Sequence, residues 1–169
     1  MQRTPSLWLQ ASAAAVHLYT ASGAVLAFLI ALAAIAGDAV GALWLLLIAL
    51  IIDSTDGSLA RRFRVSETLP WFDGRRLDDI VDYLTYVFAP VLLLWMGGYL
   101  PSGLAGMVLA TMPLLASSYQ FCRVDAKTDD HFFLGFPSYW NVVAFYAIVF
   151  NLAPSTVSII LVVFSLLVF

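Results

Sequence analysis

Long apolar stretches are the feature that most limits how this chain can fold. The first runs from about residue 16 to residue 36 without a charged side chain, and others follow along the sequence. A helix needs about 20 mostly apolar residues to cross a bilayer. Only 11% of the 169 residues are charged, whereas a soluble domain carries roughly a quarter. Because so few charges cannot cover a water-facing surface, we expect an all-α, polytopic helical bundle in a membrane.

The apolar pattern predicts about six membrane helices in a single domain of residues 1–169. The expected spans are residues 16–36, 40–62, 77–96, 100–119, 138–153 and 155–169. The apolar start of the second span, "VGALWLLLIALII", covers only roughly 20 Å of the roughly 30 Å hydrocarbon layer. That helix must therefore continue through "DSTDGSLARRF". The last span is still apolar at Phe169, so we expect a chain truncated from a longer protein.

The basic residues predict which side of the membrane each connection faces. Lys and Arg collect in cytoplasmic loops, and with six spans all eight of them fall on one side. They are Arg3, Arg61, Arg62, Arg64, Arg75, Arg76, Arg123 and Lys127. The opposite connections, "GDAVG", "GGYLPSG" and "NLAPS", contain none. We therefore expect both ends of this chain in the cytoplasm, and nothing in the sequence indicates nucleic-acid binding.

Four aspartates are expected to meet near the cytoplasmic surface. Asp53 and Asp56 are spaced i,i+3 at the end of the second span, and Asp78 and Asp82 are spaced i,i+4 at the start of the third. Each pair shares one helix face. Because the two helices run in opposite directions, Asp53 and Asp82 form the deeper pair. If the two faces meet, four carboxylates share a small volume.

Such a cluster needs neutralisation, because charges in a low dielectric are costly. Hard oxygen ligands suit Mg²⁺, Mn²⁺ or Ca²⁺, and two divalent ions would balance four carboxylates. The neighbouring residues suit a phosphate. Gly57 leaves the helix backbone open, Arg61 offers a forked donor, and Gly74 lies where a helix N-terminus favours anions. For any one of these residues, a solvated helix flank is the competing interpretation.

Taken together, these residues resemble a known family. The CDP-alcohol phosphotransferases carry D-x-x-D-G-x-x-A-R followed, after a variable gap, by G-x-x-x-D-x-x-x-D. The sequence here reads "DSTDGSLAR" from Asp53 to Arg61 and "GRRLDDIVD" from Gly74 to Asp82, so every motif position matches.

The resemblance implies a chemistry and a set of roles. A CDP-linked donor, two divalent metal ions (Mn²⁺ or Mg²⁺) and an alcohol that displaces CMP would meet at the aspartates. The implied metal ligands are Asp53, Asp56, Asp78 and Asp82, with Asp82 also the general base. The implied nucleotide and diphosphate contacts are Asp53, Asp56, Gly57, Ala60, Arg61 and Gly74. Family members commonly form homodimers, and a homodimer is expected here.

Stretches outside the motif resemble one branch of this family, the bacterial phosphatidylcholine synthases. They are "VHLYTASGAVLA", "LPWFDGRRLDDIVDYLTYVFAP" and "FLGFPSYWNVVAFY". This branch implies CDP-diacylglycerol as donor, choline as acceptor and the bacterial inner membrane as location. Quaternary ammonium groups are held on aromatic faces, and the candidates for such a cage are Tyr83, Tyr86, Tyr139 and Trp140. Aromatic residues also belt membrane interfaces without binding anything.

Three alternatives remain open from the sequence. The first is another enzyme of the same family with a different acceptor alcohol: a phosphatidylserine, phosphatidylinositol phosphate or phosphatidylglycerol phosphate synthase. An intramembrane prenyltransferase also binds a diphosphate between acidic helices, although its motifs lack the D-G-x-x-A-R continuation. A transporter is the third, because acids within a span often mark ion paths. Against it, the acids gather at one end of their spans.

Overall fold

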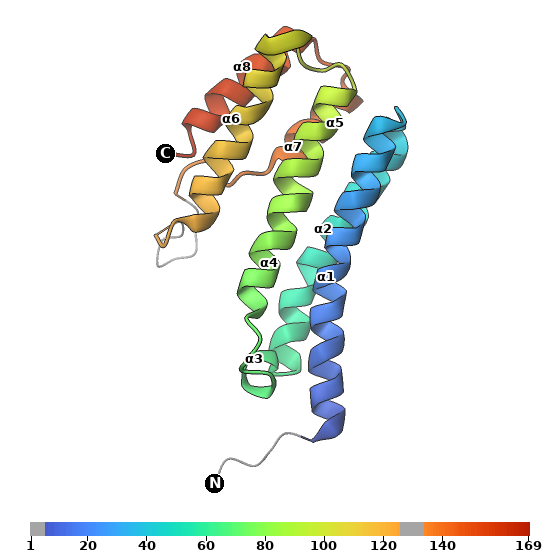
Figure 1. The fold of residues 1–169 in the computed structure, drawn as a ribbon, viewed down its shortest axis with the longest axis vertical. Helices are drawn as coiled ribbons and strands as arrows, with labels where there is room; N and C mark the ends of the chain where they lie inside the picture. Colours follow the sequence, from blue (N-terminus) through green and yellow to red (C-terminus); the bar gives the residue numbers. More distant parts are fainter. Residues whose placement is uncertain (1–5, 126–133) are drawn as a thin grey trace.

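The computed structural model describes residues 6–125 and 134–169, and in these residues every regular element is a helix (Figure 1). Arg3 and Lys127, both used in the prediction of sidedness, lie outside them. The elements are α1 (Leu7–Ile35), α2 (Ala39–Arg62), α3 (Val65–Thr68), α4 (Gly74–Asp82), a π-helix η1 (Tyr83–Phe88), α5 (Ala89–Met96), α6 (Gly103–Cys122), α7 (Trp140–Val149) and α8 (Pro154–Leu166).

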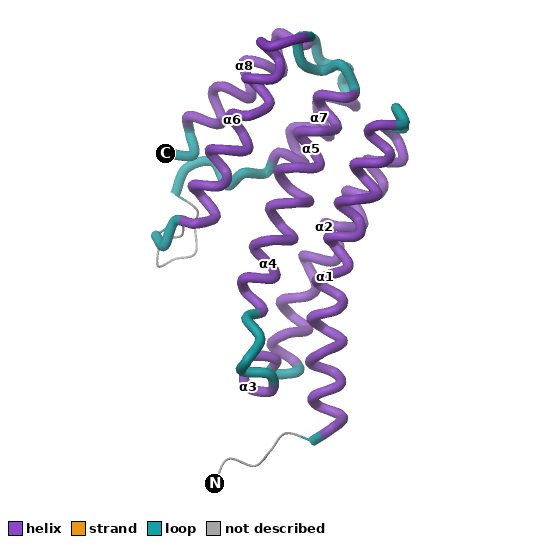
Figure 2. The backbone as a smooth tube through the Cα atoms, viewed as in Figure 1, coloured by secondary structure: helices purple, strands orange, loops and turns teal. Residues whose placement is uncertain are grey.

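The helices form an elongated bundle in which consecutive long helices run in opposite directions (Figure 2). α1 and α2 form an antiparallel pair, and the continuous rod of α4, η1 and α5 packs beside α1. α7 packs against α5, and α6 pairs with α8 on the far side of that rod (Figure 1). The short α3 closes the connection between α2 and α4.

The predicted membrane bundle is confirmed, with shorter helices at its C-terminal end than expected. Within residues 6–125 and 134–169, four helices are long and apolar enough to cross a membrane: Leu7–Ile35, Ala39–Arg62, Gly74–Met96 and Gly103–Cys122. The first begins at Leu7, well before the expected start at residue 16. α7 and α8 occupy the last two expected spans but have 10 and 13 residues, about 15 and 20 Å of rise. Neither length reaches across the roughly 30 Å hydrocarbon layer.

The tight turn between α1 and α2 follows from two adjacent residues. Gly37 adopts a left-handed conformation with φ +74°, and its N–H donates to the Ala34 carbonyl, while the Asp38 N–H donates to that of Ala33. This Schellman arrangement satisfies the last carbonyls of α1. The Asp38 carboxylate then accepts from the Gly41 N–H at 2.8 Å and caps α2. The "GD" pair therefore has a structural role, which explains why the acid Asp38 lies in the connection between α1 and α2.

Small side chains hold the first two helices close together. Ala27 and Ala34 of α1 and Ala42 of α2 are buried in one cluster with residues of α5. Small residues allow close backbone approach between membrane helices. Large apolar side chains such as Phe28 and Trp44 stay more than half exposed. An apolar outer surface is what lipid requires and what a soluble monomer avoids. The chain is therefore a multi-pass membrane protein.

The third span contains a π-helix that the sequence pattern did not predict. Pro90 lacks an N–H and cannot bond to the Tyr86 carbonyl, and its ring crowds that carbonyl in a regular α-helix. Residues Tyr83–Phe88 form the wider π turns immediately before Ala89. Such segments occur frequently at functional sites. Here the π-helix begins directly after Asp82, so it determines how the following aromatic residues face the acids.

Candidate active site

Three of the four carboxylates that were expected to converge meet in one cluster. Asp53 projects from α2, and Asp78 and Asp82 project from α4, with one carboxylate oxygen of each lying within 4.8 Å of the other two. All three side chains are partly buried. The one-turn spacing places both α4 acids on one face of that helix, near the Asp53 side chain. Three negative charges at this separation repel one another strongly where water is scarce.

Asp56 lies beside this cluster but is held differently. Its side chain is buried at 6% exposure, and its Oδ2 accepts a hydrogen bond of 2.8 Å from the Thr20 hydroxyl of α1. Its neighbour Thr55 bonds to the Tyr19 hydroxyl at 2.9 Å. The prediction from the sequence did not include α1 as a wall of the site. The signal was present as "YT" within a largely apolar stretch.

Of the residues expected to contact a phosphate, Gly57 and Arg61 lie on an open face of α2 and Ala60 is partly covered. A Cβ added at Gly57 would meet nothing closer than Arg61 Nη1 at 3.5 Å, so this face of α2 is open. Arg61 is exposed, and its Nη2 donates to the Ser58 hydroxyl at 3.1 Å. Ala60 is partly buried and packs against the small cluster under α3.

Gly74 lies where the N-terminus of α4 meets α1. A Cβ on Gly74 would come within 2.8 Å of the His17 ring, which also packs on Phe72 with 4.3 Å between ring centroids. Glycine here permits the close approach of the two helices. The Asp73 carboxylate caps α4 by accepting from the Arg76 N–H at 3.1 Å.

Two of the four aromatic candidates lie beside the acids. Tyr86 is buried at 6% exposure, and its hydroxyl lies near Asp53 and Asp82 without a well-formed hydrogen bond. Tyr139 packs edge-on against Tyr86 with 6.0 Å between ring centroids and keeps 42% of its surface exposed. The pair therefore offers aromatic surface next to negative charge.

The other two candidates face α6. The Tyr83 hydroxyl donates to the Leu114 carbonyl at 2.9 Å and accepts from Ser118 at 3.1 Å. Trp140 is fully buried, and its Nε1 donates to the Ser117 hydroxyl at 2.8 Å. The structure thus places Tyr83 and Trp140 in helix packing, away from the carboxylates.

The donor set fits hard divalent cations. Carboxylate oxygens grouped this closely are typical ligands for Mg²⁺, Mn²⁺ or Ca²⁺, and a cation removes the repulsion among them. The acids also lie beside an open helix face and a guanidinium, where a phosphate can approach. The arrangement can therefore hold a cation and a phosphate ester together at one end of a membrane bundle.

Comparisons with known proteins agree with this site. A profile of CDP-alcohol phosphatidyltransferases matches residues 14–169. A phosphatidylcholine synthase of Legionella bozemanae is 47% identical over 129 residues, covering 76% of this chain and 59% of the relative. Proteins of the same name from Legionella pneumophila and Pseudomonas aeruginosa are each 44% identical, covering 91% and 86% of this chain and 60% of each relative.

The chain spans about three fifths of the length of these curated relatives. No solved structure matches it.

Proposed function

Because the chain belongs to the CDP-alcohol phosphatidyltransferase family, we propose that it transfers the phosphatidyl group of CDP-diacylglycerol to choline, giving phosphatidylcholine and CMP. The observation that carries the proposal is the cluster of Asp53, Asp78 and Asp82, whose oxygens lie within 4.8 Å of one another. The shared name of the relatives supports choline as the acceptor. The profile match over residues 14–169 supports a single domain.

The metal ligands in this proposal are Asp53, Asp78 and Asp82. Asp56, an α2 residue whose carboxylate bonds to α1, is the fourth. Two bound divalent ions, Mn²⁺ or Mg²⁺, would supply charge neutralisation on the diphosphate and on the departing CMP. Four carboxylates balance two such ions. Thr20 orients Asp56 through its 2.8 Å hydrogen bond. Gly57, Ala60, Gly74 and the Arg61 guanidinium border the space for the nucleotide and diphosphate.

Asp82 is the proposed general base. The acceptor hydroxyl needs a proton acceptor within hydrogen-bond reach while its oxygen attacks phosphorus. A carboxylate oxygen of Asp82, the deepest acid on α4, takes that proton as the new phosphorus–oxygen bond forms and the bond to CMP breaks.

Tyr86 and Tyr139 are the proposed face of the choline site. The trimethylammonium group offers no hydrogen-bond donor, so aromatic faces beside carboxylates suit it. The two rings lie 6.0 Å apart at nearly right angles, next to Asp53 and Asp82. Tyr83 and Trp140, the other two aromatic candidates, support this wall through their bonds to α6.

The proposed setting is the bacterial inner membrane, with the acid cluster and both ends of this chain facing the cytoplasm. Arg61 and Arg62 end α2 on the same side as the acids, in agreement with the distribution of positive charge in membrane proteins. A homodimer is also proposed, from the family resemblance alone.

The test is CMP release from CDP-diacylglycerol by the purified protein in detergent with Mn²⁺ or Mg²⁺. Choline, serine, inositol phosphate, glycerol 3-phosphate and no acceptor are offered in parallel, to this chain and to a longer form that matches the length of the relatives. Release that requires choline supports the proposal. Release with another acceptor keeps the family and contradicts the choline assignment. If neither form releases CMP with any acceptor, the transferase assignment is contradicted.

A further inference from the structure

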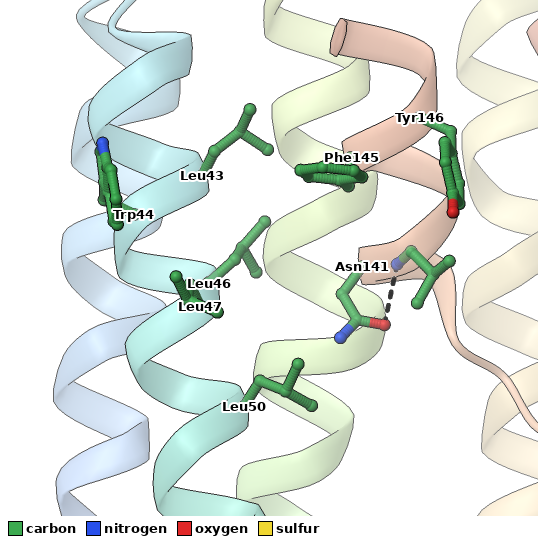
Figure 3. Close-up of a pocket in the computed structure, with 9 residues that line it drawn as sticks. Leu43, Trp44, Leu46, Leu47, Leu50, Asn141, Phe145 and Tyr146 are labelled. Atoms are coloured by element: carbon green, nitrogen blue, oxygen red, sulfur yellow. Dashed lines mark hydrogen bonds between the residues drawn. The ribbon is translucent and has the colours of Figure 1, made fainter.

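An apolar groove of about 480 Å³ lies between α2 and α7, away from the acids (Figure 3). Its α2 wall consists of four leucines and Trp44, and its α7 wall is apolar and aromatic except for Asn141. Leu47 and Leu50 remain 43% and 41% exposed, so the groove opens on the outer surface of the bundle. In a membrane protein this surface meets lipid tails.

Asn141 brings an amide to this groove, whose other polar groups are the Tyr146 hydroxyl and the Trp44 indole N–H. The residue is 7% exposed, and its Oδ1 accepts from the Val142 N–H at 2.9 Å. With this bond, the oxygen end of the amide lies on the backbone of α7. The Nδ2 group therefore points across the groove toward α2 (Figure 3). Among the residues that the structure describes, Nδ2 has no hydrogen-bond partner, and a donor in apolar surroundings needs one.

One face of α2 carries both the leucines of the groove and Asp53 of the acid cluster. Leu43, Leu46, Leu47 and Leu50 are followed at helical spacing by Asp53, which lies about 4.5 Å further along the axis than Leu50. On the other wall, Asn141 follows Tyr139 by two residues, and Tyr139 packs on Tyr86 beside the acids. A molecule with its diphosphate at Asp53 would extend its apolar part into this groove.

We propose that the groove holds an acyl chain of the lipid donor and that Asn141 Nδ2 donates a hydrogen bond to the ester carbonyl of that chain. This inference rests on the proposed function. An ester carbonyl is the acceptor that a diacylglycerol carries between its diphosphate and its tails. Asn141 faces the α2 leucines at the level of Leu47 and Leu50 (Figure 3), which is roughly one to two helical turns from Asp53. Asn141 is thus a specificity residue that favours ester-linked over ether-linked donors.

The first test compares CDP-diacylglycerol with its dialkyl ether analogue, which lacks the carbonyls. The unmodified protein should use the ester with kcat/KM about tenfold higher, the size of one hydrogen bond. Asn141→Leu should lose this preference while using the ether as the unmodified protein does. Asn141→Asp keeps an acceptor for the Val142 N–H but has no amide donor, so it should lose the preference as well. An unchanged ester-to-ether ratio in both variants would overturn the proposal.

The second test fills the groove. Leu47→Trp should raise the KM for dioleoyl donors several-fold more than for dioctanoyl donors. Ile48→Trp is the matched control, because Ile48 has 44% exposure on the same helix and does not line the groove. Equal effects of the two variants on dioleoyl donors would count against an acyl chain in this place.

A binding measurement separates the inference from the proposed reaction. CDP-diacylglycerol with a photoreactive group at the end of one acyl chain should label α2 between Leu43 and Leu50 or α7 between Val142 and Tyr146, whether or not CMP is released. Labelling confined to other helices would contradict the groove assignment even if turnover with choline is normal. Labelling here without turnover would retain the groove and contradict the proposed reaction.

Discussion

The two halves of α2 present one continuous stripe with opposite chemistry. In the apolar half, before Asp53, four leucines and a tryptophan face α7 across the groove. The polar half, after Ile52, carries Asp53, Asp56 and Arg61. The acids meet α4 and α1 in the polar half, while α7 borders the groove in the apolar half. A single helix thus places a charge cluster at the end of an apolar groove.

This difference shows how a membrane protein can bring a lipid and a soluble substrate together. Charged side chains are expensive within the bilayer, and they stay where cations or other partners neutralise them. The polar half is therefore expected to determine turnover, and the apolar half to determine which lipid is used. Substitutions in and around the polar half separate these two contributions.

The largest effect is expected from Asp82→Asn. Loss of the proposed base should lower kcat by about 10²–10⁴, measured as CMP release with choline. Asp79→Asn is the matched control, because Asp79 is exposed on the same helix and lies outside the three-acid cluster. The metal-free Asp82→Asn protein should unfold at the same or a higher temperature, since one repelling charge is gone. Similar kcat values for the two variants would remove Asp82 from the mechanism.

A smaller effect is expected from Thr20→Val on α1. The variant keeps the shape of the side chain but removes the donor to Asp56, and a hydrogen bond to a charged group corresponds to about tenfold or more in rate. We expect kcat/KM to fall by about tenfold and the Mn²⁺ dependence to move to higher concentration. Thr111→Val, on the exposed face of α6, should change neither quantity. Equal behaviour of the two variants would show that α1 does not orient the polar half.

The contact between α1 and α4 is tested through stability. A Cβ at Gly23 would lie 2.5 Å from Val81 Cγ1, so Gly23→Ala should lower the free energy of unfolding by about 1–3 kcal/mol through overpacking. Adding Val81→Ala makes room and should recover part of the loss. Denaturation in detergent measures both. If the double variant is less stable than Gly23→Ala alone, the close approach is not the cause.

The smallest effect is expected at the exposed end of α6, remote from α2. A hydrogen bond from the Arg123 guanidinium holds the pKa of Asp125 below its usual value, and the two groups lie 2.6 Å apart. A depressed pKa contributes stability above the unfolded value of about 3.9, and this contribution is lost as the pH falls through the lower folded value. Because exposed pairs contribute little, Asp125→Asn should leave Tm at pH 7 within error. A Tm loss of several degrees would show a coupling that exposure does not explain.

The meeting of the acids could be predicted from the sequence because it depends on helical periodicity. Spacings of three and four residues determine which side chains share a face, and this was sufficient for Asp53, Asp78 and Asp82. It was not sufficient for Asp56, whose partner Thr20 lies on α1. Which face of α1 meets α2 depends on packing of small residues such as Ala27 and Ala42, which apolar content alone does not reveal.

Other features depended on local geometry that the residue pattern signals weakly. Pro90 marked the break that became the π-helix, but proline in a membrane helix is also compatible with a simple kink. The start of α7 follows Ser138, which adopts φ +60° and is buried. A left-handed serine is uncommon, and without it the expected span began two residues early. Asn141 was visible as a polar residue in an apolar run, but the groove it faces was not.

Mn²⁺ binding to the purified protein, followed by electron paramagnetic resonance, tests the central claim most directly. We predict saturable binding of two ions per chain in the presence of CDP-diacylglycerol, lost in Asp53→Asn and retained in Asp79→Asn. Binding that is equal in both variants, or no saturable binding at all, would contradict a metal centre formed by α2 and α4.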